Sequence, residues 1–94
     1  FSQCEYTFSK KPFFNLGYAY MMNGDYENAK EMYSHVVELA PAFLDEALFN
    51  LAFVHDKLGE PNKSIENLRE AIAFNPNNEQ AKKYLRRLER RAKR

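Results

Sequence analysis

The sequence is poor in the residues on which many compact catalytic and metal sites depend. Its 94 residues include one cysteine, Cys4, three glycines and no tryptophan. A lone cysteine cannot form a disulfide within the chain, and it excludes zinc sites built on paired cysteines. The cysteine content fits a reducing compartment, which favours the cytoplasm but leaves the localisation otherwise open.

Long apolar runs and glycine-rich phosphate loops are also missing. No stretch approaches the roughly 20 apolar residues that cross a bilayer. His35 and His55 lie 20 residues apart with no carboxylate at zinc spacing, so we expect no metal site. No cysteine–histidine arrangement for a nucleophile is recognisable either. We therefore expect the protein to be non-catalytic and to hold no cofactor. His35 falls on an outward position of a predicted helix and is expected to be exposed.

What the sequence does contain indicates a folded chain with uneven charge. Hydrophobic residues make up 45% and aromatic residues 15%, too much for a disordered chain. The net charge of +1 is the sum of a basic region and an acidic region. Residues 79–94 hold eight basic and two acidic residues, and the rest of the chain holds six basic and eleven acidic residues. An acidic body therefore carries a basic end.

Glycine and proline residues, which commonly mark the ends of helices, recur at a fixed spacing in the sequence. Gly24 and Gly59 are 35 residues apart, as are Pro41 and Pro76. Apolar residues at helical spacing predict helices over 12–22, 26–39, 44–58 and 61–74. The boundaries agree, because Asn23–Gly24–Asp25 reads as a helix stop followed by an N-cap, and Pro61 suits a first helical position.

A fifth helix is predicted over 79–94. Asn77 with Gln80 three residues later resembles a capping box that would open this helix. Its apolar stripe contains Ala81, Leu85, Leu88 and Ala92, with Tyr84 at the edge. Basic residues occupy the other side, as a terminal helix with a polar outer face requires.

Two stretches of residues carry a known repeat pattern. The first copy reads Phe13, Leu16-Gly17, Tyr20, Ala29, Tyr33 and Pro41, and the second reads Leu48, Leu51-Ala52, His55, Ser64, Leu68, Ala71 and Pro76. Over residues 10–94 the chain resembles the tetratricopeptide repeat family. The resemblance implies an all-α fold, an α-α superhelix of antiparallel helix pairs. Its expected parts are two repeats, over 10–43 and 44–78, and a capping helix over 79–94.

Side chains of the pattern have expected packing roles. Gly17 and Ala52 are small where the paired helix passes close, and Ala29 and Ala71 serve the same approach from the second helix. A second group is expected to fill the seam between helices: Phe13, Leu16, Tyr20, Tyr33 and Leu39. His55, which holds the place of the family's tyrosine in the second copy, is expected to be packed and hydrogen-bonded in this seam.

Residues 1–9 remain open to two interpretations. They form an irregular arm whose aromatic side chains pack on the first pair, or the remnant of a preceding element. Cys4 as a lipid attachment point is disfavoured, because no apolar run precedes it.

The resemblance also implies a concave groove lined by the first helix of each pair. The positions carried over from the family are Phe14, Asn15, Tyr18, Met21 and Met22, then Phe49, Asn50, Phe53, Asp56 and Lys57, and finally Lys83, Tyr84 and Arg87. Some members clamp the acidic C-termini of chaperones, but here only Asn50 matches that clamp. Phe14, Tyr18, Gln80 and Tyr84 hold its other positions, so recognition of a chaperone tail is disfavoured.

An apolar groove of this kind predicts a protein partner, a peptide or helix with apolar anchors and an acidic end. The alternative is that the N-terminal segment or a second copy of the chain fills it. The basic last helix leaves nucleic acid or an anionic membrane surface as competing partners. The acidic body opposes a phosphate backbone, and no aromatic residues interleave the basic run as nucleic-acid stacking requires. A membrane surface is disfavoured because the apolar face of the last helix is needed for capping rather than for lipid.

Overall fold

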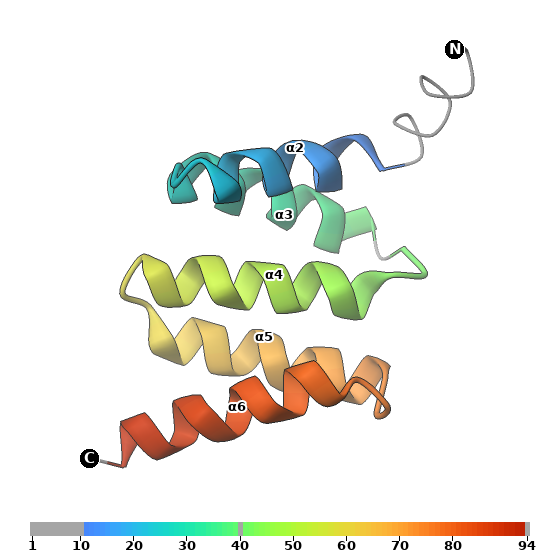
Figure 1. The fold of residues 1–94 in the computed structure, drawn as a ribbon. Helices are drawn as coiled ribbons and strands as arrows, with labels where there is room; N and C mark the ends of the chain where they lie inside the picture. Colours follow the sequence, from blue (N-terminus) through green and yellow to red (C-terminus); the bar gives the residue numbers. More distant parts are fainter. Residues whose placement is uncertain (1–10, 40, 94) are drawn as a thin grey trace.

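The computed structural model describes residues 11–39 and 41–93, and within these ranges it contains five α-helices and no strand (Figure 1). They are α2 (Pro12–Met22), α3 (Tyr26–Leu39), α4 (Leu44–Lys57), α5 (Pro61–Phe74) and α6 (Glu79–Ala92). The all-α prediction is confirmed. The expectations for residues 1–9, including Cys4, and for Arg94 lie outside the described residues. The third helix ends at Lys57, one residue before the predicted end.

The turns within each pair follow from local sequence. Gly24 and Gly59 have φ values of +81° and +78°, a left-handed conformation that glycine adopts without a steric penalty. Asp25 Oδ1 accepts a hydrogen bond from the backbone N–H of Asn28 at 3.3 Å, as an N-cap side chain does. Pro61 occupies the first position of α5, where a backbone donor is not needed.

Each helix packs against the next one along the chain, so the helices form a stack (Figure 1). In addition α2 contacts α4, so first helices of the two pairs are neighbours. α4 lies between α3 and α5 and contributes more buried residues than any other described helix. The arrangement is the stack of antiparallel helix pairs that the repeat pattern predicts.

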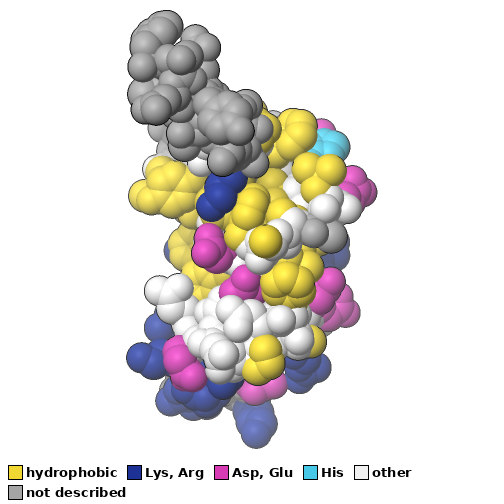
Figure 2. All heavy atoms as spheres, turned by 90° about the vertical axis from the view of Figure 1, so that its right-hand side faces the viewer, with side chains coloured by type: hydrophobic (Ala, Val, Ile, Leu, Met, Phe, Trp, Pro, Cys, Tyr) yellow, Lys and Arg dark blue, Asp and Glu magenta, His cyan; other side chains and the backbone are white. Residues whose placement is uncertain are grey.

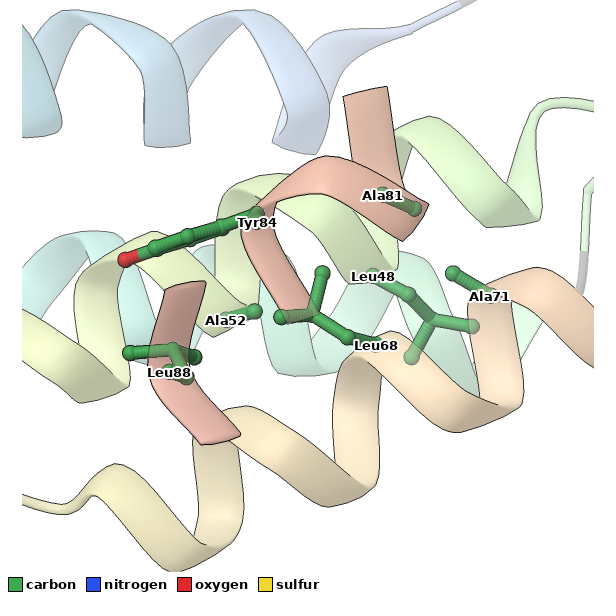
Figure 3. Packing of buried hydrophobic residues seen from close by; sticks show 7 residues of the cluster. All are labelled: Leu48, Ala52, Leu68, Ala71, Ala81, Tyr84 and Leu88. Carbon is green, nitrogen blue, oxygen red and sulfur yellow. The ribbon is translucent and has the colours of Figure 1, made fainter. Parts of the chain in front are cut away.

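Two apolar clusters hold the stack together. The larger one joins α4, α5 and α6 through Leu48, Ala52, Leu68, Ala71, Ala81, Tyr84 and Leu88 (Figure 3). The smaller one joins α3 and α4 through Ala29, Tyr33, Leu51 and Val54. Ser64, which replaces the family's alanine, is fully buried and donates its hydroxyl to the Ala52 carbonyl at 2.7 Å.

The close approach expected at Gly17 is present. A Cβ at this position would lie 3.1 to 3.2 Å from three ring atoms of Tyr33, which is tighter than ordinary contact. Ala29, Ala52 and Ala71 are fully buried, as the same argument predicts.

Other packing expectations were wrong. Phe13, Leu16 and Leu39 were expected to fill the seam, yet all three are exposed. α4 has a described helix on each side, whereas α2 is covered by α3 and touches α4 only at its edge. Tyr84, expected at the edge of its stripe, is buried, and Ala92, in the last turn, is exposed.

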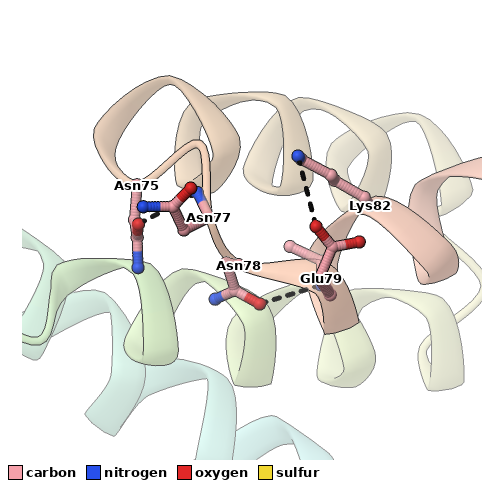
Figure 4. Close-up of polar contacts among 6 residues, drawn as sticks. Asn75, Asn77, Asn78, Glu79 and Lys82 are labelled. Carbon is pink, nitrogen blue, oxygen red and sulfur yellow. Dashed lines mark hydrogen bonds and ion pairs between the residues drawn. The ribbon is translucent and has the colours of Figure 1, made fainter.

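The predicted cap of the last helix was also wrong. The N-cap of α6 is Asn78, whose Oδ1 accepts from the backbone N–H of Ala81 at 3.0 Å (Figure 4). Asn77 instead donates its backbone N–H to Asn75 Oδ1 at 3.1 Å. Asn78 is fixed by a distant residue, because its Nδ2 donates to Asp45 Oδ2 on α4 at 2.7 Å. Asn75 Nδ2 donates to the same oxygen at 3.0 Å.

Candidate functional site

A cleft of about 530 Å³ opens between α4 and α6. It is lined by Phe49, Phe53, Asp56, Lys57, Gln80, Lys83, Tyr84, Arg87 and Arg91. Seven of these side chains belong to the groove that the family resemblance implies. The cleft therefore brings together seven of the eight groove residues predicted on α4 and α6, and the eighth, Asn50, is not part of its lining.

The floor of the cleft is aromatic and held in place from below. The rings of Phe49 and Tyr84 lie 5.6 Å apart, and Phe53 meets Tyr26 edge-on at 6.4 Å. Phe49 and Phe53 are half-buried and pack on the larger apolar cluster. Their inner faces are thus fixed by the core, while their outer faces line the cleft.

Cationic side chains stand at the edge of this floor. Lys57 Nζ lies 5.4 Å from the centre of the Phe53 ring, and the Arg87 guanidinium lies 5.9 Å from the Tyr84 ring. Both distances suit a cation over an aromatic face. Lys83 also lines the cleft and is exposed.

Asp56, predicted as a groove residue, binds α6 to α4. Its Oδ2 accepts from the Tyr84 hydroxyl at 2.8 Å, and its Oδ1 accepts from Arg91 Nη2 at 2.6 Å. Burial and the Asp56 carboxylate raise the pKa of Tyr84 above its ordinary value of 10.0, so this hydroxyl stays a donor. Arg91 neutralises the one acidic side chain that lines the cleft.

A second hollow, of about 230 Å³, continues from Phe49 toward α2. Phe14 and Asn50 line it together with Glu46, Asn78 and Gln80. Asn50 Nδ2 donates to the Tyr33 hydroxyl at 3.2 Å, so the one residue that matches the chaperone-tail clamp is engaged within the fold. Burial raises the pKa of Tyr33 to about 12.

The groove residues predicted on α2 do not gather around one hollow. Phe14 packs edge-on against Tyr33 at 5.7 Å and Phe43 at 5.3 Å, and Met21 packs on the smaller cluster. Asn15 is half-buried, while Tyr18 and Met22 are exposed. Asn15, Tyr18, Met21 and Met22 line neither of the two hollows. The candidate site is therefore centred on α4 and α6.

Sequence reasoning missed two lining residues of the main cleft. Arg91 lies four residues after Arg87, which places both on one face of α6, so helical spacing could have revealed it. Gln80 is expected in the capping box of the last helix and at a clamp position that it does not match, but not in the groove. Its place in the cleft follows from α6 beginning at Glu79, one turn before Lys83.

Both histidines lie as expected. His35 is exposed, with its ring 5.4 Å from that of Phe13. His55 is buried, with Nδ1 2.6 Å from Asn67 Oδ1. Within residues 11–39 and 41–93 no cluster of three or more His, Asp or Glu side chains is arranged to hold a metal ion. None of the described helices is long and apolar enough to span a membrane.

Comparison with known proteins places the repeat pattern in its family. No curated protein matches the chain. The family model described as Tetratricopeptide repeat matches residues 11–43 and 45–78, which is more than half of the chain. The chain therefore belongs to the tetratricopeptide repeat family, whose members are generally protein-protein interaction modules and typically non-catalytic.

Proposed function

We propose that the chain binds a segment of a protein partner, a peptide or a helix, in the cleft between α4 and α6. The observation that carries this proposal is an open aromatic floor of Phe49, Phe53 and Tyr84 bordered by cations. Aromatic rings offer a large and rigid contact area for an apolar anchor of the partner. Lys57, Lys83 and Arg87 favour acidic residues beside that anchor.

The charge of the cleft supports an acidic partner rather than a basic one. Asp56 is its one acidic lining residue, and both carboxylate oxygens accept hydrogen bonds from Tyr84 and Arg91. Its charge is thus compensated within the fold. An incoming carboxylate therefore meets cations at the rim and no uncompensated negative charge on the lining.

The second hollow gives the partner a path beyond the main cleft. Phe49 lines both hollows, and Phe14 and Asn50 extend the lining toward α2. An extended segment seated on Phe49 would then reach α2, where the exposed Tyr18 and Met22 are available for further contact. Asn15 and Met21, which are half-buried, would form the inner edge of this path.

The proposal is tested by selecting displayed random peptides on the folded chain. We expect the selected peptides to share an apolar or aromatic residue next to Asp or Glu. Phe53→Ala and Lys83→Glu should each weaken a selected peptide by about tenfold or more, equivalent to ~1.4 kcal/mol. Matched controls are Phe74→Ala and Lys63→Glu, which change exposed side chains of α5 outside the cleft. Peptides that bind equally well to all four variants would place the site elsewhere.

Nucleic acid is the alternative for the basic helix. Several basic side chains of the C-terminal end are engaged within the protein: Arg91 with Asp56, Arg87 over Tyr84 and Lys82 with Glu79. A labelled oligonucleotide at low salt tests the alternative directly. Affinity that falls steeply with salt and is lost in Arg86→Glu with Arg90→Glu would favour nucleic acid over the peptide cleft.

A further inference from the structure

The first helix pair exposes an apolar surface that its counterpart in the second pair buries. Positions 35 residues apart hold equivalent places in the two pairs, so they can be compared directly. Phe13 is 40% exposed and its counterpart Leu48 is 0% exposed. Leu16 is 44% exposed and its counterpart Leu51 is 5% exposed. The two pairs therefore differ in what covers the first helix rather than in what it presents.

In the second pair α3 forms part of this cover. Ala29 and Tyr33 of α3 pack against Leu51, and Val37 of α3 packs against the cluster that holds Leu48. No described helix takes this place over Phe13 and Leu16 of α2. The second pair thus shows the kind of element that fits the surface, a segment with large apolar side chains.

The uncovered surface has a hollow at the end where α2 begins. This hollow of about 80 Å³, the volume of two or three water molecules in the liquid, is lined by Lys11, Pro12, Phe13, Phe14, Val36, Leu39, Pro41 and Phe43. Apart from Lys11 its lining is apolar, so an apolar side chain fits it better than water does. Figure 2 views the molecule from the side where α3 ends and α6 begins, with hydrophobic side chains gathered over the first pair and Lys and Arg at the α6 end.

Ten residues of the chain precede this hollow, and they have the matching chemistry. Residues 1–10 contain Phe1, Tyr6 and Phe8, and they join the described chain at Lys11, which itself lines the hollow. Phe8 is three residues from Lys11, within about 11 Å even along a fully extended chain. Residues 36–39 form the last turn of α3, the helix that covers α4. The positions 35 residues earlier are Phe1–Cys4, so in the repeat pattern they correspond to that turn.

We propose that residues 1–8 pack on the surface formed by Phe13, Leu16 and Leu39, with the Phe8 side chain in the hollow beside Pro12 and Val36. The segment takes the place on α2 that α3 takes on α4. A short tether raises the effective concentration of Phe8 at the hollow into the millimolar range, so a modest apolar contact is enough to seat it. This surface is distinct from the cleft between α4 and α6, so the docked segment leaves that cleft open.

Cys4 makes the placement measurable, because it is the sole cysteine of the chain. A nitroxide attached to Cys4 of the full chain should broaden the amide signals of Leu16 and Leu39 and spare those of Phe53 and Arg87. Reduction of the nitroxide supplies the reference spectrum. Broadening at Phe53 and Arg87 would mean that the segment fills the cleft, and no broadening at all would mean that it docks nowhere. Either result overturns the proposal.

A mixing experiment separates this docking from self-association. Isotope-labelled chains that carry Cys4→Ser are mixed with unlabelled chains that carry the nitroxide. Signals of Leu16 and Leu39 should then remain sharp. Broadening in the mixed sample would assign the surface to a second copy and overturn the proposal.

A double-mutant cycle tests the same contact without a label. Phe8→Ala should lower the urea midpoint of the full chain, and it should have little further effect in a Phe13→Ala background. In a Phe74→Ala background, which alters an exposed ring on α5, the loss from Phe8→Ala should be undiminished. An unchanged midpoint in Phe8→Ala, or equal losses in both backgrounds, would contradict the contact. None of these outcomes depends on peptide binding, so they do not decide the proposed function.

Discussion

Tyr33 links the two helix pairs through three kinds of contact. Its ring lies against Gly17 on α2, it packs with Leu51 and Val54 of α4, and its hydroxyl accepts from Asn50. The side chain is fully buried, so its position is set from several sides at once. A glycine opposite such a ring is a packing requirement, although glycine inside a helix is unfavourable by up to about 1 kcal/mol relative to alanine.

Gly17→Ala tests whether packing outweighs helix propensity. The added Cβ would meet the Tyr33 ring at 3.1 Å, and crowding of a packed core costs about 1–3 kcal/mol. We expect the free energy of unfolding in urea to fall by about 1 kcal/mol despite the gain in propensity. Ala19→Gly, at an exposed position of the same helix, measures the propensity term alone. A Gly17→Ala protein more stable than the parent would show that the ring has room to move.

The two shifted tyrosines predict a loss of stability in alkali. The pKa of Tyr33 is raised to about 12 and that of Tyr84 is raised as well, from 10.0 in the unfolded chain. Both hydroxyls therefore ionise more readily after unfolding. Their contribution to stability is complete below pH 10 and is lost as the pH rises toward 12.

The urea midpoint measured from pH 9 to 12 checks this expectation. It should fall more steeply in the parent than in Tyr33→Phe with Tyr84→Phe, because lysine ionisation is common to both proteins. Tyr18→Phe, which removes an exposed hydroxyl, should follow the parent. Parallel curves for all three proteins would contradict the raised pKa values.

At the scale of the elements, α4 holds α6 through an aspartate near each end. Asp45 accepts from Asn75 and Asn78, and Asp56 accepts from Tyr84 and Arg91. The connection between α5 and α6 is therefore fixed by a residue about 30 positions earlier in the chain. This explains how α6 is oriented over the cleft as well as how it is capped.

Asp45→Ala should loosen the start of α6. It removes the acceptor of two hydrogen bonds, and hydrogen bonds to charged groups contribute about 1.5–3 kcal/mol each before relaxation. We expect the free energy of unfolding in urea to fall by about 2 kcal/mol. Glu46→Ala, an exposed neighbour on the same helix, is the control and should change it by less than about 0.5 kcal/mol. Similar values for the two variants would show that the Asn75 and Asn78 amides find water as readily as they find Asp45.

The same residues show how far the sequence could be interpreted in advance. The helix limits next to Gly24, Gly59 and Pro61 were predictable to within a residue, because these residues act on their immediate neighbours. The last helix, predicted to run to residue 94, ends at Ala92. The cap of α6 was not, because two adjacent asparagines are equally suitable and Asp45 selects Asn78 by a contact 33 residues away. Seven lining residues of the cleft were expected from positions carried over from the family, whereas Gln80 and Arg91 were not. The exposure of Phe13 and Leu16 was not predictable either, because it depends on what covers α2.

For the whole molecule, α6 serves as the cover of the last pair. Ala81, Tyr84 and Leu88 close the apolar cluster that includes Leu48 and Leu68 (Figure 3). The opposite side of α6 is strongly basic and remains in solvent. Without α6 the apolar face that α4 and α5 present to it would be open to solvent.

Removal of residues 79–94 should therefore abolish a stable monomer. The truncated chain would expose Leu68, Ala71 and Leu48 to water, a loss comparable with the total stability of a small domain. Circular dichroism and sedimentation velocity should show an unfolded or associated chain. Removal of Lys93 and Arg94 alone is the control and should leave a folded monomer. A folded monomeric 1–78 chain would show that α6 is dispensable.

The attachment of α6 has a consequence for motion. One wall of the cleft is α6, which packs on α5 and α4 through the larger apolar cluster and accepts further support from Asp56 of α4, so a local opening of α6 would also open the cleft. A ligand that touches both α4 and α6 would bind only the closed form. Occupancy of the cleft should then slow amide hydrogen exchange throughout α6, including residues the ligand never touches.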